Sequence, residues 1–157
     1  MPADADLGQL AHALNALYRL SGSARFHERT VAATGVQLSR SGLRFLSLVA
    51  DTAPVSGSRL AEALDLSQPT ASRVLQQLET AGLVERKALS GDRRVSHYVL
   101  TRTGRTALAK VHAYHVAQLS TALEDLAPAR RATLAGAVVE LLGRLHQDEA
   151  RTTSRSA

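Results

Sequence analysis

Residues 60–101 read LAEALDLSQPTASRVLQQLETAGLVERKALSGDRRVSHYVLT, and this stretch decides the fold. Leu60, Ala61 and Leu64 fall at i, i+1 and i+4, so they share one face of a helix and can be buried together. The polar Asp65 then interrupts the apolar run. The pattern predicts a short amphipathic helix that ends in a tight turn.

A second helix is predicted directly after this turn. Ser67 is a suitable N-cap, and Pro69 fits the first helical turn, where its missing N–H has no cost. Gly82 ends the helix as a C′ glycine does. The expected inward stripe repeats at i, i+3, i+4 and i+7: Ala71, Val74, Leu75 and Leu78. The opposite face is short, hydrogen-bonding and nearly free of acid until Glu79, which suits the base edges and phosphates of a major groove. A merely solvated helix face is the alternative.

A β-hairpin is predicted after Gly82, with strands near 83–87 and 95–101. The second run is rich in β-branched and aromatic residues, and the turn between the runs contains Gly-Asp. Arg93 and Arg94 at the tip suit a narrow minor groove, which attracts guanidinium groups. Asp92 is better placed to orient an arginine than to contact DNA. The alternative is an exposed charged turn without a role.

Several short motifs occur here in a specific order. They are Leu60-Ala61 with Leu64, the run from Ser67 to Arg73, Leu78-Glu79 with Gly82-Leu83-Val84 and Arg86, Asp92-Arg93-Arg94, and Val99 with Thr101 and Gly104. In order and spacing the segment resembles the MarR family of winged helix-turn-helix transcriptional regulators, and the flanking helices extend the likeness to about residues 7–148. The resemblance implies a mainly α (α+β) fold, with a winged helix-turn-helix core and terminal helices that form a dimerisation region.

The resemblance also implies a function. A homodimer, acting as a repressor in the bacterial cytoplasm, would bind a palindromic operator in double-stranded DNA. Its recognition helices would lie in successive major grooves and its wings in the flanking minor grooves. The implied recognition-helix contacts are Ser67, Gln68, Thr70, Ser72, Arg73 and Gln76. In the wing, Arg94 would enter the minor groove, Asp92 would support it, and Arg93 would lie nearer the phosphates.

The chain divides into four expected regions. Residues 1–38 form an N-terminal dimerisation helix, since apolar residues recur at threes and fours through 7–33. Residues 39–103 form the DNA-binding region, which opens with a helix at 39–50 capped by Ser39, with Leu43, Leu46 and Val49 inward. Residues 104–150 form C-terminal dimerisation helices interrupted at Ala127-Pro128. The small polar tail at 151–157 is expected to be disordered. The terminal helices carry more apolar surface than one subunit buries, which favours a second copy.

Composition narrows the function classes. The 157 residues carry a formal charge of +5, which favours an anionic partner. Cysteine is absent, so disulfides and thiolate chemistry are excluded. No apolar run reaches about 18 residues and no signal-peptide pattern is present, so we expect a cytoplasmic protein without membrane contact. The sequence has no nucleophile elbow, phosphate-binding glycine loop or HExxH motif, so we expect neither an enzyme nor a cofactor. A winged-helix module that binds other proteins is an alternative.

The resemblance further implies a small-molecule effector, such as a phenolic acid, bound between the dimerisation helices and the DNA-binding region. An arginine beside an aromatic ring suits such an anion. The candidates are Phe26, His27, Arg29, Arg44, Phe45, His112 and His115. Structural roles are the alternative: the phenylalanines would be core residues, and the arginines would be surface charges or phosphate contacts.

A zinc-responsive regulator of the same fold is a second alternative. His112 and His115 are three residues apart and share a helix face. Further ligands would have to come from His12, His27 or Glu28 in the first helix. We therefore expect no metal site.

Overall fold

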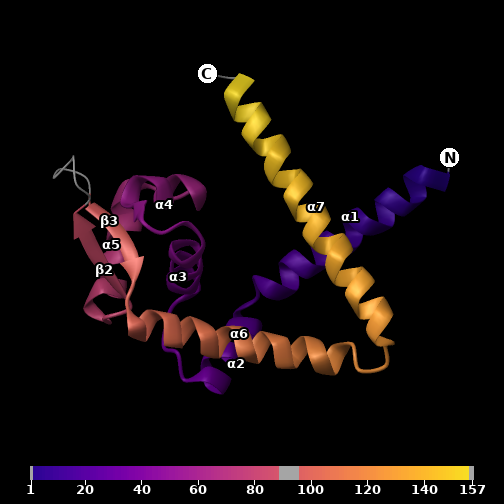
Figure 1. The fold of residues 1–157 in the computed structure, drawn as a ribbon, viewed down its shortest axis with the longest axis horizontal. Coiled ribbons are helices and arrows are strands. Elements are labelled where there is room, and N and C mark those ends of the chain that lie inside the picture. The colour runs from indigo at the N-terminus through magenta and orange to yellow at the C-terminus, as the bar shows by residue number, and fades with distance from the viewer. Residues whose placement is uncertain (1, 89–95, 156–157) are drawn as a thin grey trace. The chain divides into compact units, whose positions relative to one another are not determined.

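The computed structural model describes residues 2–88 and 96–155, with side chains for 5–87 and 96–148 (Figure 1). The chain separates into two compact units, residues 1–115 and 116–157. In chain order the elements are α1 (Pro2–Ser21), α2 (Ala24–Thr34), α3 (Arg40–Thr52), β1 (Val55–Ser56), α4 (Gly57–Ala63), α5 (Gln68–Thr80), β2 (Val84–Ala88), β3 (Ser96–Leu100), α6 (Arg102–Ala122) and α7 (Pro128–Arg155). The boundary between the units falls within α6.

The predicted fold class is confirmed: the chain is mainly helical, with a small antiparallel sheet next to a helix-turn-helix. The sheet has the order β1-β3-β2. The predicted hairpin is present as β2 and β3, in which Arg86 lies opposite Tyr98. The two-residue strand β1 was not predicted; it pairs Val55 with Tyr98 and Ser56 with His97.

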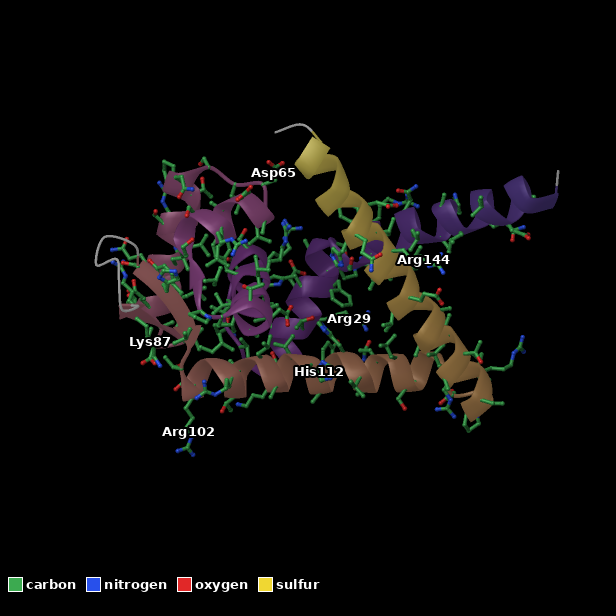
Figure 2. The ribbon with its side chains drawn as sticks, turned by 45° about the horizontal axis from the view of Figure 1, so that its top comes forward. Arg29, Asp65, Lys87, Arg102, His112 and Arg144 are labelled. Carbon is green, nitrogen blue, oxygen red and sulfur yellow. The ribbon has the colours of Figure 1, made fainter. Side chains whose placement is uncertain are left out.

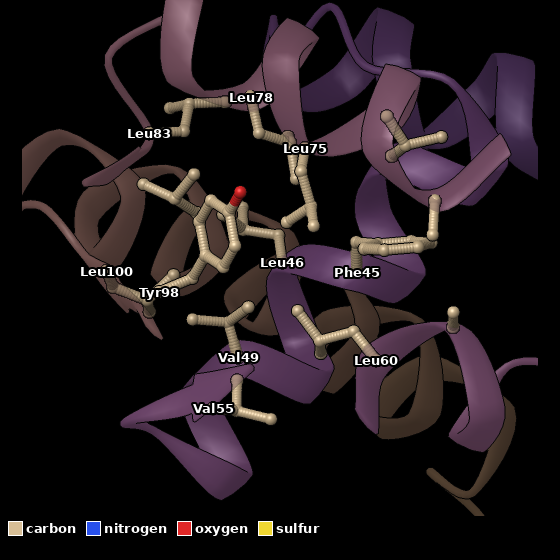
Figure 3. Packing of buried hydrophobic residues seen from close by; sticks show 14 residues of the cluster. Phe45, Leu46, Val49, Val55, Leu60, Leu75, Leu78, Leu83, Tyr98 and Leu100 are labelled. Atoms are coloured by element: carbon tan, nitrogen blue, oxygen red, sulfur yellow. The ribbon is translucent and has the colours of Figure 1, made fainter. Parts of the chain in front are cut away.

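The core of the first unit lies between α3, α4, α5 and the sheet (Figure 3). The side chains with almost no exposed surface are Phe45, Leu46, Val49, Leu60, Leu75 and Leu78. Ser39 caps α3 as predicted, because its hydroxyl accepts a hydrogen bond from the Gly42 N–H at 3.0 Å. Leu46 and Val49 are buried as predicted, whereas Leu43 is only half-buried.

The N-terminal region contains two helices where the sequence pattern predicted one. The break falls at Gly22 and Ser23. The Ser23 hydroxyl accepts a hydrogen bond from the Phe26 N–H at 3.1 Å, so Ser23 is the N-cap of α2. Gly35, with a φ of 69°, ends α2 in the left-handed region. The helical spacing of apolar residues continues across this break, so the spacing alone did not indicate that the helix ends there.

In the second unit, α6 ends at Ala122 and α7 begins at Pro128, so the predicted interruption at Ala127-Pro128 is confirmed. Helix α7 continues through residues 151–155, which belong to the tail for which the sequence predicted disorder. No Gly or Pro follows Gly143, so the chain contains no residue that would stop the helix at 150. Among the described residues, no helix has the length and apolar content needed to cross a membrane.

Candidate nucleic-acid interface

The turn between α4 and α5 is fixed by backbone hydrogen bonds. The Leu66 N–H donates to the Ala61 carbonyl at 2.9 Å, and the Asp65 N–H donates to the Glu62 carbonyl at 3.1 Å. This pair of bonds is a Schellman motif with Asp65 at C′, and Asp65 accordingly has a φ of 51°. Aspartate tolerates the left-handed region better than most residues. The motif therefore explains how the polar interruption in the sequence turns the chain from α4 into α5.

The N-terminus of α5 differs in detail from its prediction. Ser67 occupies the N-cap position with extended backbone angles, and Pro69 lies in the first turn as predicted. The Ser67 hydroxyl makes no capping hydrogen bond; it is instead hydrogen-bonded to the Thr70 hydroxyl at 2.8 Å. Both hydroxyls are exposed, at the end of the helix that carries the candidate DNA contacts.

The outer face of α5 is an exposed polar surface. Its inward stripe is buried as predicted: Ala71, Val74, Leu75 and Leu78. All six predicted recognition-helix contacts are exposed: Ser67, Gln68, Thr70, Ser72, Arg73 and Gln76. Arg73 and Gln76 also line a shallow depression that continues to Thr80 and Ala81. The stripe holds α5 against the core, so the hydrogen-bonding face is presented by a rigid element.

The wing begins with the paired strands β2 and β3, of which β2 contacts α5 (Figure 1). Its predicted minor-groove residues Arg93 and Arg94, with the supporting Asp92, lie outside the described residues. What the structure describes is the hairpin that carries them, paired from Val84 with Leu100 to Ala88 with Ser96.

The C-terminus of α5 is joined tightly to the start of α6. A second Schellman motif ends α5, with Gly82 at C′ and a φ of 66°. The Thr101 hydroxyl donates to the Gly82 carbonyl at 2.6 Å and accepts from the Gly104 N–H at 3.0 Å. The Thr101 N–H donates to the Leu83 carbonyl at 3.1 Å. Thr101 therefore caps α6 and ties it to the corner behind α5.

One interaction that the sequence did not predict joins α5 to the wing. Arg86 Nε lies 2.9 Å from Glu79 Oε1, and the Arg86 guanidinium lies 5.6 Å from the centroid of the Tyr98 ring. The hydrogen bond to Glu79 raises the pKa of Arg86. Burial raises the pKa of Tyr98 above its usual value. The hairpin prediction could have placed Arg86 opposite Tyr98, but no local pattern connects either residue with Glu79.

A groove of about 870 Å³ lies between α3, the sheet and the first part of α6. Its basic lining residues are Lys87, Arg102, Arg105, His112 and His115; three of them are labelled in Figure 2. Asp51 and Glu85 also line it, and Glu85 Oε1 lies 3.7 Å from Lys87 Nζ. The groove therefore has a mixed surface, with three Lys or Arg side chains against two acids. No local sequence pattern indicated that Lys87, Arg102 and Arg105 would converge with the histidines.

The structure brings together only some of the predicted effector residues. His112 and His115 line the groove, and the Phe26 ring lies 5.3 Å from the His115 ring, centroid to centroid. Phe45 has no exposed surface and belongs to the core. The other three do not line the groove: His27 is half-buried, and Arg29 and Arg44 are exposed.

His115 is the most unusual of these residues. Its Nε2 atom is buried and makes no hydrogen bond. Burial, followed by the charge of His112, lowers the pKa of His115. Within residues 2–88 and 96–155, no three His, Asp or Glu side chains gather closely enough to hold a metal ion.

Comparison with known proteins agrees with this geometry. A family model described as "MarR family" matches residues 36–95. The "Putative transcriptional regulatory protein for hcr operon" of Thauera aromatica is 32% identical over 164 residues, which cover 96% of this chain and 92% of that protein.

Solved structures share the fold. A MarR family protein from Bacillus stearothermophilus matches with a TM-score of 0.72 at 16% identity, over 92% of this chain and 96% of that one. FabT from Streptococcus pneumoniae, solved in complex with DNA, matches with a TM-score of 0.56 at 20% identity, over 93% and 96% of the two chains. The chain therefore belongs to the MarR family of winged helix-turn-helix transcriptional regulators, which are DNA-binding proteins rather than enzymes.

Proposed function

We propose that the protein is a homodimeric repressor that binds a palindromic operator. Helix α5 of each subunit enters one of two successive major grooves, and each wing enters a flanking minor groove. The observation that carries this proposal is the outer face of α5, which is exposed, polar and held rigid by a buried stripe. The similar fold of FabT, a structure solved with DNA, supports the same mode of binding. Such a regulator acts in the bacterial cytoplasm.

The chemistry of each side chain on the outer face of α5 suggests which part of the DNA it contacts. Arg73 and Gln76 have the donors and acceptors that read base edges, guanine for arginine and adenine for glutamine. The hydroxyls of Ser67, Thr70 and Ser72 suit phosphate oxygens, and Gln68 suits either kind of contact. In the wing, Arg94 would enter the minor groove with the support of Asp92.

The homodimer rests on exposed apolar surface in the terminal helices. On α1 the exposed residues are Leu7, Leu10, Leu14, Leu17 and Leu20; on α7 they are Leu134, Val138, Val139, Leu142 and Leu145. Contiguous apolar surface of this kind in a monomer marks an interface. A two-fold dimer buries it and presents two copies of α5 to a palindrome.

We further propose that an anionic, phenol-like effector weakens operator binding by occupying the groove along α6. The groove volume is within the usual range for ligand pockets, and its arginines suit a carboxylate. His115, whose ring is tilted by 30° against that of Phe26, adds an aromatic surface at one end. Zinc is the weaker candidate effector. A tight zinc site has four ligands, and His112 and His115 would supply only two of them.

Selection of operators from random DNA, followed by fluorescence anisotropy over a salt series, tests the main proposal. The wild-type protein should enrich a palindrome and lose affinity steeply with salt. Arg73→Ala should weaken binding by about tenfold or more and relax the preference at one position in each half-site. Lys110→Ala, which removes an exposed cation on α6, is the matched control. The absence of an enriched sequence would refute the proposal, as would equal affinities of wild type and Arg73→Ala. Reduced transcription in vitro from a promoter overlapping the operator tests repression.

A further inference from the structure

Glu79, Arg86 and Tyr98 form a small cluster, named here the α5–wing cluster. Glu79 is in the last turn of α5, Arg86 is in the middle of β2, and Tyr98 is opposite it in β3. The three residues therefore come from the recognition helix and from both strands of the wing.

Tyr98 anchors the cluster in the core, whereas Arg86 and Glu79 are partly exposed to solvent. Tyr98 is 6% exposed and packs in the core, which fixes its ring. The Arg86 guanidinium lies over this ring at 5.6 Å and within 2.9 Å of the Glu79 carboxylate. The side chains of Arg86 and Glu79 are 54% and 26% exposed, so water screens the ion pair and its contribution to overall stability is small. The guanidinium is positioned by two partners at once, since it lies over the ring of Tyr98 and its Nε meets the carboxylate of Glu79.

The place of the cluster suggests its role. At the base of the wing, Thr101 already joins the hairpin to the corner behind α5 through its bonds to Gly82 and Leu83. The β3 side of the hairpin is also held, because β3 pairs with β1 and because Tyr98 and Leu100 pack in the core. The α5–wing cluster adds a side-chain attachment from β2, three residues after Leu83, to the last turn of α5. This attachment limits how far β2 can tilt relative to the recognition helix.

We infer that Arg86 is a positioning residue for DNA binding. It holds the wing at a fixed inclination to α5, so that the major and minor grooves are engaged together. The inference rests on the proposed function, because it assumes that α5 and the wing contact DNA. It predicts that the cluster matters for DNA binding more than for folding.

Glu79→Gln tests this inference, because the two explanations predict opposite changes in DNA affinity. Neutralising an acid beside a DNA polyanion tightens binding if only long-range electrostatics matters. If Glu79 acts through Arg86, the same substitution weakens binding, because the guanidinium loses the partner that orients it. Glu85→Gln is the matched control. Glu85 is an exposed acid on β2, next to Arg86 in the chain, and is not part of the cluster.

The experiment compares two DNA duplexes. One is the full selected operator, and the other is trimmed at both ends to remove the flanking minor grooves while keeping the major-groove half-sites. On the full operator, Glu79→Gln and Arg86→Gln should each weaken binding by about three- to tenfold, within the range expected for an oriented cation–π and ion-pair contact. On the trimmed operator Glu79→Gln should match the wild type or exceed it, and Arg86→Gln should lose clearly less affinity than on the full operator, because only the long-range effect of the lost charge is left. Arg86→Lys should behave like Arg86→Gln, because an ammonium lacks the planar fork.

Two results would overturn the inference. One is that Glu79→Gln tightens binding to the full operator, as Glu85→Gln is expected to do. The other is that Arg86→Gln weakens binding to both duplexes equally, which would mean that Arg86 contacts DNA beneath α5 or supports the helix itself. Thermal midpoints within a few degrees of wild type establish that each variant is folded. Failure of the proposed function gives a different result, since the wild-type protein would then bind neither duplex.

Discussion

Gly104 lies so close to the main chain of Leu83 that a Cβ at residue 104 would collide with the Leu83 carbonyl. The same carbonyl accepts a hydrogen bond from the Thr101 N–H at 3.1 Å. The first turn of α6 is thus pressed directly against the corner that follows α5. A displacement of this turn is expected to move the C-terminal end of α5 with it, because Thr101 and Gly104 contact Leu83 and the Thr101 hydroxyl is bonded to the Gly82 carbonyl. If the proposed effector binds beside α6, this joint is the route by which it would act on α5.

Gly104→Ala should destabilise the protein by about 2–3 kcal/mol, because the methyl group meets a backbone carbonyl that cannot rotate away. Urea unfolding followed by circular dichroism measures the change. Gly8→Ala in α1 is the matched control, since a Cβ at that residue has nothing within 4 Å. That control should be neutral or stabilising by up to about 1 kcal/mol. A Gly104→Ala protein as stable as wild type would show that the contact is looser than described.

Gly82→Ala tests a different effect, because a Cβ at Gly82 also meets nothing within 4 Å but φ is 66°. The expected cost is about 1–2 kcal/mol, from the left-handed conformation alone. Gly82→Asn should cost less, since asparagine tolerates this region. Equal losses for alanine and asparagine in the same urea assay would argue against a purely conformational origin.

Thr101→Val removes the hydroxyl that bridges the end of α5 and the start of α6 while keeping a β-branched side chain. It should cost about 1–3 kcal/mol, because the Gly82 carbonyl and the Gly104 N–H both lose their partner. Thr101→Ser keeps the hydroxyl and should recover most of that stability in thermal unfolding. If valine is as stable as threonine while serine is not, the methyl group rather than the hydroxyl supports the joint.

His115 should make stability depend on pH. Its pKa in the folded protein is lowered, first by burial and then by His112, from an ordinary value of 6.5. As the pH falls through this value the unfolded chain binds the proton more readily, so the free energy of unfolding decreases below about pH 6.5. His115→Phe keeps an aromatic ring beside Phe26 and should reduce the loss of stability between pH 7 and pH 5. His12→Gln, at an exposed residue, should leave the loss unchanged. An unaltered pH profile for His115→Phe would contradict the role given to this residue.

The local parts of the fold were predictable from the sequence. The buried stripe of α5, the Ser39 cap of α3 and the Gly82 terminus of α5 depend on residues within a few positions of one another, and all three are present. The hairpin was predictable for the same reason, since its strands are adjacent in the chain.

Features that depend on distant residues were missed. Strand β1 has two residues and exists only because Val55 pairs with Tyr98, 43 positions later. The helix break at Ser23 was hidden by an apolar rhythm that continues through it. The α5–wing cluster and the groove along α6 were not predicted, because each gathers side chains from separate elements. Phe45 was a candidate ligand contact from its residue type, but it has no exposed surface.

Dimethyl sulfate protection on the selected operator is the most direct test of the central claim that paired α5 helices read two major grooves. The reagent methylates guanine N7, which faces the major groove. We expect two protected regions on one face of the duplex, centred about 10 base pairs apart. Arg73→Ala should remove the protection in both regions together. Protection confined to one region, or unaffected by Arg73→Ala, would contradict the claim.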